Sequence, residues 1–356
     1  MDRRPTQSDV ARAAGVHRAT VSLVFKNHPS IPEQTKSKVR MCAEKLGYSP
    51  DPMLSALAAY RGRLRPRAFE GTLAWLTNDD GTESWRGVAG FRDLYEGASA
   101  RAKIHGFHIE GFDLKRSAPS PERLASMFRF RNIHGILLPP QLEPNTEIEF
   151  PWQEFCAVTF GYSLVKPQLH TVTATQFRSM VQTMRQLKRL GYKRIGFFFT
   201  ANHDEKTDHN YLAGYLVERY GCGKSATIPP LFLSEAYPEK FKKWYEKYRP
   251  EAIVTGNRDT LDFLQSLRIR VPLDLGVASP LVPQRNSKLA GVYEDSFHIG
   301  EVATDFLVAM IHRGERGVPV RSQRVHIEGE WNPGSTLRQM ADAVAPDSTE
   351  QYAEIA

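Results

Sequence analysis

Two short apolar stripes at helical spacing open this chain, one on each side of a glycine. In the run TQSDVARAAGVHRATVSLVFKNH (6–28), Gly15 interrupts the first stripe, and Val16 anchors the turn that leads to the second. The residues of the two stripes are Val10, Ala13, Ala14, Val21, Val24 and Phe25. Two short helices joined by a turn of this length are either a plain packing unit or a helix-turn-helix, whose second helix enters the DNA major groove.

A third amphipathic helix is predicted directly afterwards. Pro32 suits a first helical position and Gly47 suits a helix end, while the residues between them form one apolar stripe: Val39, Cys42, Ala43 and Leu46. A short helix then follows, which Asp51 can cap and Pro52 can start, with Leu54, Leu57 and Ala58 on one face. Residues 62–71 are rich in Arg, Pro and Gly and are expected to form a linker.

Beyond the linker, β-rich runs alternate with helical stretches. The predicted strands lie at 72–77, 107–112, 134–138, 156–160, 194–200, 252–255 and 276–279, and the predicted helices at 88–105, 121–131, 176–190, 210–220 and 259–267. This rhythm predicts two α/β lobes, each a parallel sheet flanked by helices. Ligands of such sheets bind at the carboxyl ends of the strands, so a cleft between the lobes is the expected binding site.

Positive charge is concentrated at the start of the chain. Residues 1–67 contain 13 Lys or Arg against five acidic residues, a net charge of +8, while the remainder carries −1. A basic segment on a nearly neutral body is typical of phosphate contact, and it favours DNA binding over a plain packing unit.

Composition limits the remaining possibilities. The three cysteines (Cys42, Cys156 and Cys222) are few and far apart, which suits a reducing compartment. No secretory signal and no apolar segment of membrane-spanning length is present, so we expect a soluble, cytoplasmic protein. A length of 356 residues predicts two or three domains.

These residues resemble the LacI/GalR family of bacterial transcription regulators. The resemblance covers residues 5 to about 337. In the amino-terminal region it rests on matches in one register: Asp9-Val10-Ala11, Ala14-Gly15-Val16, Thr20-Val21-Ser22, Val24, Thr35, Val39, Leu46-Gly47-Tyr48 and Pro50. In the body, IHGILLPP (133–140), LKRLGYKRIGFFF (187–199) and LAGVYEDSFHIGEVATDFLVAMI (289–311) are similar to family segments in the same way.

The resemblance implies a domain organisation. An all-α helix-turn-helix domain (1–49) and a hinge helix with linker (50–69) would precede a periplasmic-binding-protein-like core (70–340) of two doubly wound parallel-sheet lobes. Lobe one would hold about 70–161 and 293–324, lobe two about 162–292 and 325–340, with three crossings between them and a flexible tail at 341–356. A homodimer that binds a pseudo-palindromic operator is also implied.

The resemblance assigns DNA contacts to individual residues. Arg18, Ala19 and Leu23 would read base edges, and Arg18 can bind guanine through two hydrogen bonds. The positions that would contact phosphates are Thr6, Thr20, Ser22, Lys26, Thr35 and Tyr48. Leu57, with Leu54 beside it, aligns with a wedge that enters the minor groove. His17 replaces a serine cap that the family usually has, which leaves the start of the second helix open.

Effector contacts are expected in the cleft. The residues that follow strands or stand at ligand-binding positions of relatives are Asn78, Trp85, Gln141, Phe160, His203, Tyr211, Asn257 and Arg258. Sugar-binding relatives have Arg where Tyr211 stands and Asp where Gly161 and Arg258 stand. The expected effector is a carbohydrate or a carbohydrate derivative; these departures weaken the case for an unmodified simple sugar, and Arg258 would suit an acidic ligand such as a sugar acid.

The sequence gives little support for a metal site, a cofactor or catalysis. His203, Asp204, Asp208 and His209 match no zinc-ligand spacing, so neither a metal nor a cofactor is expected. No nucleophile elbow, zinc-protease motif or complete phosphate loop is present, which argues against an enzyme. The sequence predicts an effector-controlled transcriptional regulator, a repressor in most relatives. The alternatives are a solute receptor or enzyme that shares the core fold, and a DNA-binding regulator with a vestigial, ligand-insensitive core.

Overall fold

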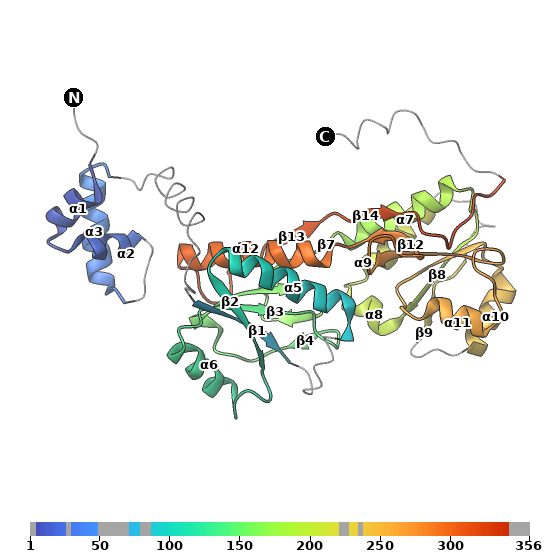
Figure 1. Cartoon of the computed structure of the whole chain (residues 1–356), viewed down its shortest axis with the longest axis horizontal. Helices are drawn as coiled ribbons and strands as arrows, with labels where there is room; N and C mark the ends of the chain where they lie inside the picture. Colours follow the sequence, from blue (N-terminus) through green and yellow to red (C-terminus); the bar gives the residue numbers. More distant parts are fainter. Residues whose placement is uncertain are drawn as a thin grey trace.

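The amino-terminal head is a bundle of three short helices. The computed structural model describes residues 5–25, 30–48, 71–78, 87–220, 228–233 and 238–341. In the head it contains α1 (Gln7–Ala14), α2 (Arg18–Phe25) and α3 (Glu33–Lys45) (Figure 1). Their shared core consists of Val10, Ala11, Ala14, Val21, Val24, Val39 and Ala43. The stripes that the sequence predicted therefore meet in one small apolar core.

The body contains a first six-stranded sheet in which all neighbouring strands are parallel. In spatial order its strands are β13 (Arg324–Ile327), β7 (His170–Ala174), β5 (Cys156–Phe160), β3 (Gly135–Leu138), β1 (Gly71–Thr77) and β2 (Phe107–Asp113). Helices α5 (Ala89–Ile104) and α12 (Ser296–Arg313) cover one face, and α6 (Pro121–Phe130) covers the other. A small separate pair, β4 (Thr146–Glu147) with β6 (Leu164–Lys166), and a 3₁₀ turn at Trp152–Glu154 lie in the connections.

A second six-stranded sheet follows the same plan. Its order is β14 (Glu330–Asn332), β12 (Ala290–Tyr293), β11 (Gly276–Val282), β10 (Ala252–Thr255), β8 (Ile195–Thr200) and β9 (Leu231–Leu233), and only β14 runs antiparallel to its neighbour. Helices α7 (Gln176–Arg189) and α9 (Asn210–Arg219) pack on one face, and α10 (Pro238–Tyr248) and α11 (Thr260–Ser266) on the other. A short helix, α8 (Ala201–Lys206), follows β8. The predicted pair of doubly wound α/β lobes is confirmed.

The chain crosses between the two sheets three times, after β7, after β12 and after β13. The number of crossings agrees with the expectation from the sequence, but two boundaries differ. The first crossing lies after Ala174 rather than after residue 161, and the third lies after Ile327 rather than after residue 324.

Strand β7 explains the first difference. Its sequence is HTVTA, which lacks the continuous apolar run of the neighbouring strands, yet all five residues are buried. Two of its side chains have hydrogen-bond partners: His170 Nδ1 accepts from the backbone N–H of Gln323, 153 positions away, at 2.9 Å, and the hydroxyl of Thr171 donates to the nearby carbonyl of Leu169. A strand whose burial depends on hydrogen bonds made elsewhere in the chain gives no apolar signal in its own sequence.

Helices α5 and α12 approach each other closely at two glycines. A Cβ atom built on Gly97 would lie 1.9 Å from the carbonyl oxygen of Phe297, and one built on Gly300 would lie 2.2 Å from that of Leu94. Both contacts are with backbone, which cannot move aside as a flexible side chain can. The glycines therefore set the spacing of a helix pair that joins the first sheet to the second crossing.

Gly97→Ala is expected to lower the free energy of unfolding by about 1–3 kcal/mol, because the added methyl group must push α5 and α12 apart. Urea denaturation checks this result. Gly111→Ala is the matched control, since a Cβ at Gly111 meets no atom within 4 Å. Equal midpoints for the two variants would mean that the helix contact is not tight.

Candidate nucleic-acid interface and ligand cleft

A tight turn sets α2 against α1. Gly15 adopts a left-handed conformation with φ 65° and ends α1, and the N–H of Val16 donates to the carbonyl of Ala11 at 3.0 Å. His17 then caps α2: its carbonyl accepts from the N–H groups of Thr20 and Val21, and its ring Nδ1 accepts from that of Ala19 at 3.3 Å. The start of α2, which the sequence left open, is therefore at Arg18, with histidine as the cap.

Substituting His17 tests this cap. His17→Ala is expected to lower operator affinity several-fold, because an uncapped helix end costs about 0.5–2 kcal/mol and α2 frays where it meets DNA. His17→Ser, which restores an oxygen acceptor, is expected to retain the affinity of the wild type. Titration of a labelled operator in a mobility-shift assay measures both. If alanine and serine behave alike, the ring nitrogen is not acting as a cap.

Helix α2 buries one face and exposes the other. Val21 and Val24 are fully buried in the core of the head. Arg18 and Ala19 are exposed, and Leu23, one helical turn beyond Ala19, is partly exposed. The side chains predicted to read bases thus lie on the face of α2 that the head does not use for packing.

Four of the predicted phosphate contacts are also accessible. Thr20, Ser22 and Thr35 are partly exposed on α2 and α3, and Thr6 is exposed in front of α1. The carboxylate of Asp9 accepts from both the N–H (2.8 Å) and the hydroxyl (2.6 Å) of Thr6. The resulting capped helix start can place its free N–H groups near a phosphate.

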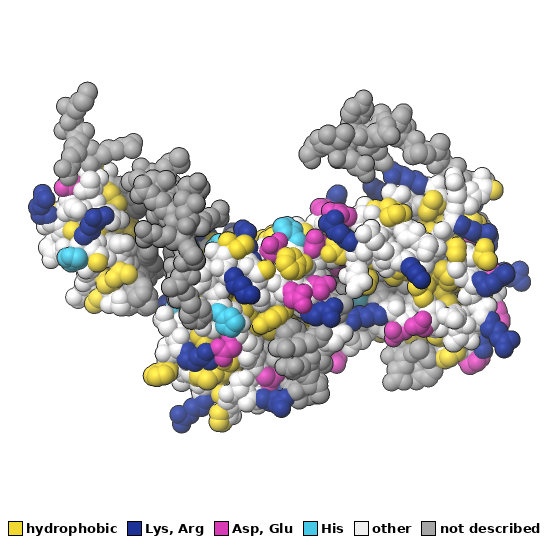
Figure 2. Space-filling view, in the orientation of Figure 1, with side chains coloured by type: hydrophobic (Ala, Val, Ile, Leu, Met, Phe, Trp, Pro, Cys, Tyr) yellow, Lys and Arg dark blue, Asp and Glu magenta, His cyan; other side chains and the backbone are white. Residues whose placement is uncertain are grey.

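Tyr48 lies beside α2. Its ring meets the ring of Phe25 edge to face, with 5.5 Å between the centroids, and its N–H donates to the carbonyl of Ala43. The head also exposes Arg12, Arg18, Lys38, Arg40 and Lys45, and basic side chains are visible on its surface in Figure 2.

The two sheets meet at the carboxyl ends of their strands. Glu143, which follows β3, accepts a hydrogen bond at 3.1 Å from the side-chain amide of Asn202, which follows β8. The same carboxylate acts electrostatically on Lys206. This contact joins the two edges directly.

On the first sheet, two of the predicted cleft residues, Gln141 and Phe160, are buried. Gln141 is 5% exposed, and its amide donates to the carbonyl of Pro139 at 2.7 Å while its N–H donates to the hydroxyl of Ser163. Phe160 packs on Trp75 with 5.6 Å between the ring centroids. Asn78, at the end of β1, is partly exposed.

On the second sheet, aromatic rings form a wall beneath the carboxyl edge, in which Tyr211 (1% exposed) and Phe199 (0% exposed) belong to the core of the lobe. The ring of Tyr211 lies 5.7 Å from that of Phe199 and 6.0 Å from that of His203. Burial, with a contribution from Lys206 and Arg258, lowers the pKa of His203 to about 4, so its imidazole is neutral at pH 7. The wall is therefore aromatic and uncharged.

Polar groups flank this wall. The hydroxyl of Tyr211 donates to Oε1 of Glu294 at 2.7 Å, and burial raises the pKa of Glu294 to about 7. Asn257 accepts from the N–H of Thr200 at 3.2 Å, and Arg258 is exposed. Tyr162, which follows β5, shares a hydrogen bond of 3.1 Å with His326.

The histidine-rich loop after β8 has a structural arrangement. His209 Nδ1 and Asp204 Oδ2 lie 2.6 Å apart, and the hydrogen bond with Asp204 raises the pKa of His209. His203 points instead into the aromatic wall. The part of the chain that the structure describes contains no group of three or more His, Cys, Asp or Glu side chains placed to hold a metal ion.

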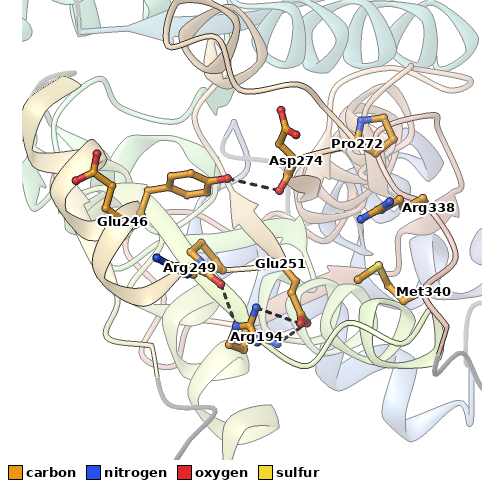
Figure 3. Close-up of a pocket in the computed structure, with 10 residues that line it drawn as sticks. Arg194, Glu246, Arg249, Glu251, Pro272, Asp274, Arg338 and Met340 are labelled. Atoms are coloured by element: carbon orange, nitrogen blue, oxygen red, sulfur yellow. Dashed lines mark hydrogen bonds and ion pairs between the residues drawn. The ribbon is translucent and has the colours of Figure 1, made fainter.

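A cavity of about 400 Å³ lies at the opposite edge of the second sheet (Figure 3). It is lined by residues next to the amino ends of β8, β10 and β11, among them Arg194, Glu251 and Asp274. Its charged groups are largely paired: Arg194 with Glu251 at 3.3 Å, and Asp274 with Arg270 at 2.7 Å. It is separate from the cleft.

The comparison with known proteins identifies the head most clearly. Residues 6–51 match the model of the family described as "Bacterial regulatory proteins, lacI family". The HTH-type transcriptional regulator TreR of Salmonella typhimurium is 25% identical over 252 residues, which span 67% of this chain and 70% of TreR. The head therefore carries the DNA-binding domain of that family, and the chain as a whole is similar to regulators of the LacI family. It is a DNA-binding transcription regulator and not an enzyme.

Solved LacI-family structures share the fold. A transcriptional regulator CelR–cellobiose complex superposes with a TM-score of 0.57 at 18% identity, covering 94% of this chain and 100% of CelR. The lac repressor dimer bound to operator and the anti-inducer ONPF gives a TM-score of 0.55 at 15% identity, with the same coverage. None of the described helices of this chain is long and apolar enough to cross a membrane.

Three residues near the two carboxyl edges were not singled out from the sequence: Tyr162, Glu143 and Glu294. Glu294 had one usable signal, because an acid directly after the strand-like run LAGVY stands at a strand's carboxyl end. Lys26, Leu54, Leu57 and Trp85 lie outside the described residues. Their assigned roles stay predictions.

Proposed function

We propose that the chain is a homodimeric repressor whose affinity for a pseudo-palindromic operator is controlled by a small carbohydrate or carbohydrate derivative. The observation that carries the DNA-binding part is the exposed face of α2, where Arg18, Ala19 and Leu23 lie opposite the buried Val21 and Val24. A second helix that buries only its rear face leaves a reading face for the major groove. The protein would act in the bacterial cytoplasm, on the DNA of the nucleoid.

The proposal extends to the connecting segment. Residues 1–49 would form the DNA-binding domain and 50–69 the hinge, in which Leu54 and Leu57 wedge into the minor groove. The predicted tail (341–356) lies, apart from its first residue, outside the described residues. The lac repressor was solved as a dimer bound to operator, which supports the same assembly here.

The ligand would bind between the two carboxyl edges. The supporting geometry is the aromatic wall of Tyr211, Phe199 and His203, and the bridge between Glu143 and Asn202. Aromatic rings with a few directed polar groups are typical of small-molecule sites. CelR was solved with cellobiose, and a related regulator from Weissella paramesenteroides with glucose.

A ligand-insensitive core is the second candidate. It is favoured by cleft side chains that already satisfy one another: Gln141 with Pro139, Tyr211 with Glu294, and Asn257 with Thr200. Such a core would still dimerise and bind DNA, but no small molecule would change its operator affinity.

Genome-wide operator mapping followed by mobility-shift titration tests the proposal. The purified full-length protein is expected to retard inverted-repeat sites, with an affinity that falls steeply as salt rises because phosphate contacts release counterions. Ligand addition is expected to change operator affinity about 5- to 150-fold. Absence of any retarded site at low salt would contradict the regulator itself. A retarded site that no ligand affects would favour the second candidate.

A further inference from the structure

Glu294 occupies an unusual place in the chain. It follows the last residue of β12 and precedes α12, so it lies on the second crossing between the sheets. Its carboxylate accepts from the hydroxyl of Tyr211, which comes from α9 and is 1% exposed. A side chain at this point is fixed to the second lobe by Tyr211 and to the first lobe by the chain that continues into α12.

The carboxyl group of Glu294 has few partners. Among the described residues, Tyr211 is the one hydrogen-bond donor to it, although an ionised carboxylate can accept about four hydrogen bonds. No cation contributes to its pKa, which burial raises to about 7 against the opposing effect of the Tyr211 hydrogen bond. Buried carboxyl groups in structural positions are normally paired, and unpaired ones concentrate at functional sites.

The charges around the site limit what can bind there. Asp295 lies beside Glu294 and is 3.6 Å from Arg285, which also pairs with Glu330 at 3.1 Å; Asp93 on α5 interacts electrostatically with Asp295. An anionic ligand group at Glu294 would therefore meet a predominantly acidic crossing.

The opposite side of the wall is basic. Lys206 and Arg258 act on His203 strongly enough to lower its pKa further. A cationic ligand group against the aromatic wall would meet this positive field. A neutral ligand that donates hydrogen bonds would be repelled by neither the acidic crossing nor the basic side.

We propose that Glu294 is the specificity-determining residue of the cleft: it accepts hydrogen bonds from hydroxyl groups of a neutral carbohydrate and releases a proton when that ligand binds. This inference rests on the proposed effector site. Paired hydroxyls match the two oxygens of a carboxylate, and the rings of Tyr211 and Phe199, which are 1% and 0% exposed, support the site from within the core of the second lobe. Because Glu294 stands on a crossing, the same contact ties ligand binding to the connection between the lobes.

The direction of the pH effect follows from the chemistry. Hydroxyl donors stabilise the ionised carboxylate, so the ligand binds the deprotonated protein more tightly. With a pKa of about 7 in the free protein, roughly a tenth of the sites are ionised at pH 6 and nine tenths at pH 8. Affinity is expected to rise about tenfold between these two values and then to level off.

A matched ligand panel provides the test. The full-length protein is screened by thermal shift against neutral sugars (glucose, galactose, cellobiose, trehalose and sucrose) and against glucuronate, galacturonate and glucosamine. Isothermal titration at pH 6 and pH 8, in two buffers of different ionisation enthalpy, then measures affinity and proton release for the strongest binder. We expect a neutral sugar to bind, with proton release and about tenfold tighter binding at pH 8.

Variants separate the role of Glu294 from general effects. Glu294→Gln is expected to lose at least tenfold in affinity at pH 8 together with the pH dependence. Glu239→Gln, on the exposed side of α10, is the control and is expected to keep both. Preferential binding of the uronates or of glucosamine, pH-independent affinity, or no binding by any panel member would each overturn the inference. Operator retardation measured in parallel shows whether DNA binding survives that outcome.

Discussion

Replacing Arg18 by alanine is expected to weaken the operator complex roughly 5- to 150-fold. Arg18 is exposed at the first position of α2, where the guanidinium can reach guanine O6 and N7 together. Such a paired contact is worth about 1–3 kcal/mol of discrimination against other bases. The loss should therefore be confined to one base pair in each half-site, and the variant should accept any base there. Competition binding against operators substituted one position at a time measures this pattern.

Lys26→Ala is the matched control for charge. Lys26 lies outside the described residues, and its predicted partner is a phosphate, which carries no sequence information. This variant is expected to weaken all operators equally and to flatten the dependence of affinity on salt, because one fewer counterion is released for each protomer. If Arg18→Ala also weakens every operator equally, Arg18 contacts the backbone and does not read a base.

The sequence predicted the parts of the fold whose signal lies within one segment. The apolar runs CAVTF, AIVT and GVAS became buried strands of the two sheets, and the stripes on each side of Gly15 became α1 and α2. Strand β7 was missed because its Thr and His residues are buried although they give no apolar run, and His170 meets its partner Gln323 only in the folded chain. Periodicity detects what a segment buries by itself, and it does not detect a segment that the rest of the fold buries.

The candidate site divides in the same way. The reading face of α2 could be predicted because all its residues lie on one helix, so their spacing fixes their shared face. The pair of Glu294 and Tyr211 is separated by 83 positions, and no local pattern relates the two. Resemblance to sugar-binding relatives marked Tyr211 as a departure from arginine, but only the fold shows which group the tyrosine hydroxyl meets.

Glu294 is also expected to lower the stability of the folded protein. A half-buried carboxyl group with one donor is less stable when ionised than it would be in water. Its pKa is about 7 in the folded chain and near 4.5 when unfolded, so the folded state binds a proton more tightly. The free energy of unfolding therefore falls as pH rises from 4.5 to 7, and the lost stability is not recovered above pH 7.

Glu294→Gln is accordingly expected to stabilise the ligand-free protein at high pH. Glutamine keeps an oxygen that accepts from Tyr211 but carries no charge, so the difference from the wild type should be near zero at pH 4.5. It should grow to about 3 kcal/mol by pH 8, from 1.36 kcal/mol for each unit of the shift in pKa from 4.5 to about 7. Urea midpoints at pH 4.5, 6 and 8 measure it, with Glu239→Gln expected to follow the wild type throughout. A Glu294→Gln protein that is no more stable than the wild type at pH 8 would show that the carboxylate is well solvated, and the site would then lack the unsatisfied acceptor that ligand hydroxyls are proposed to meet.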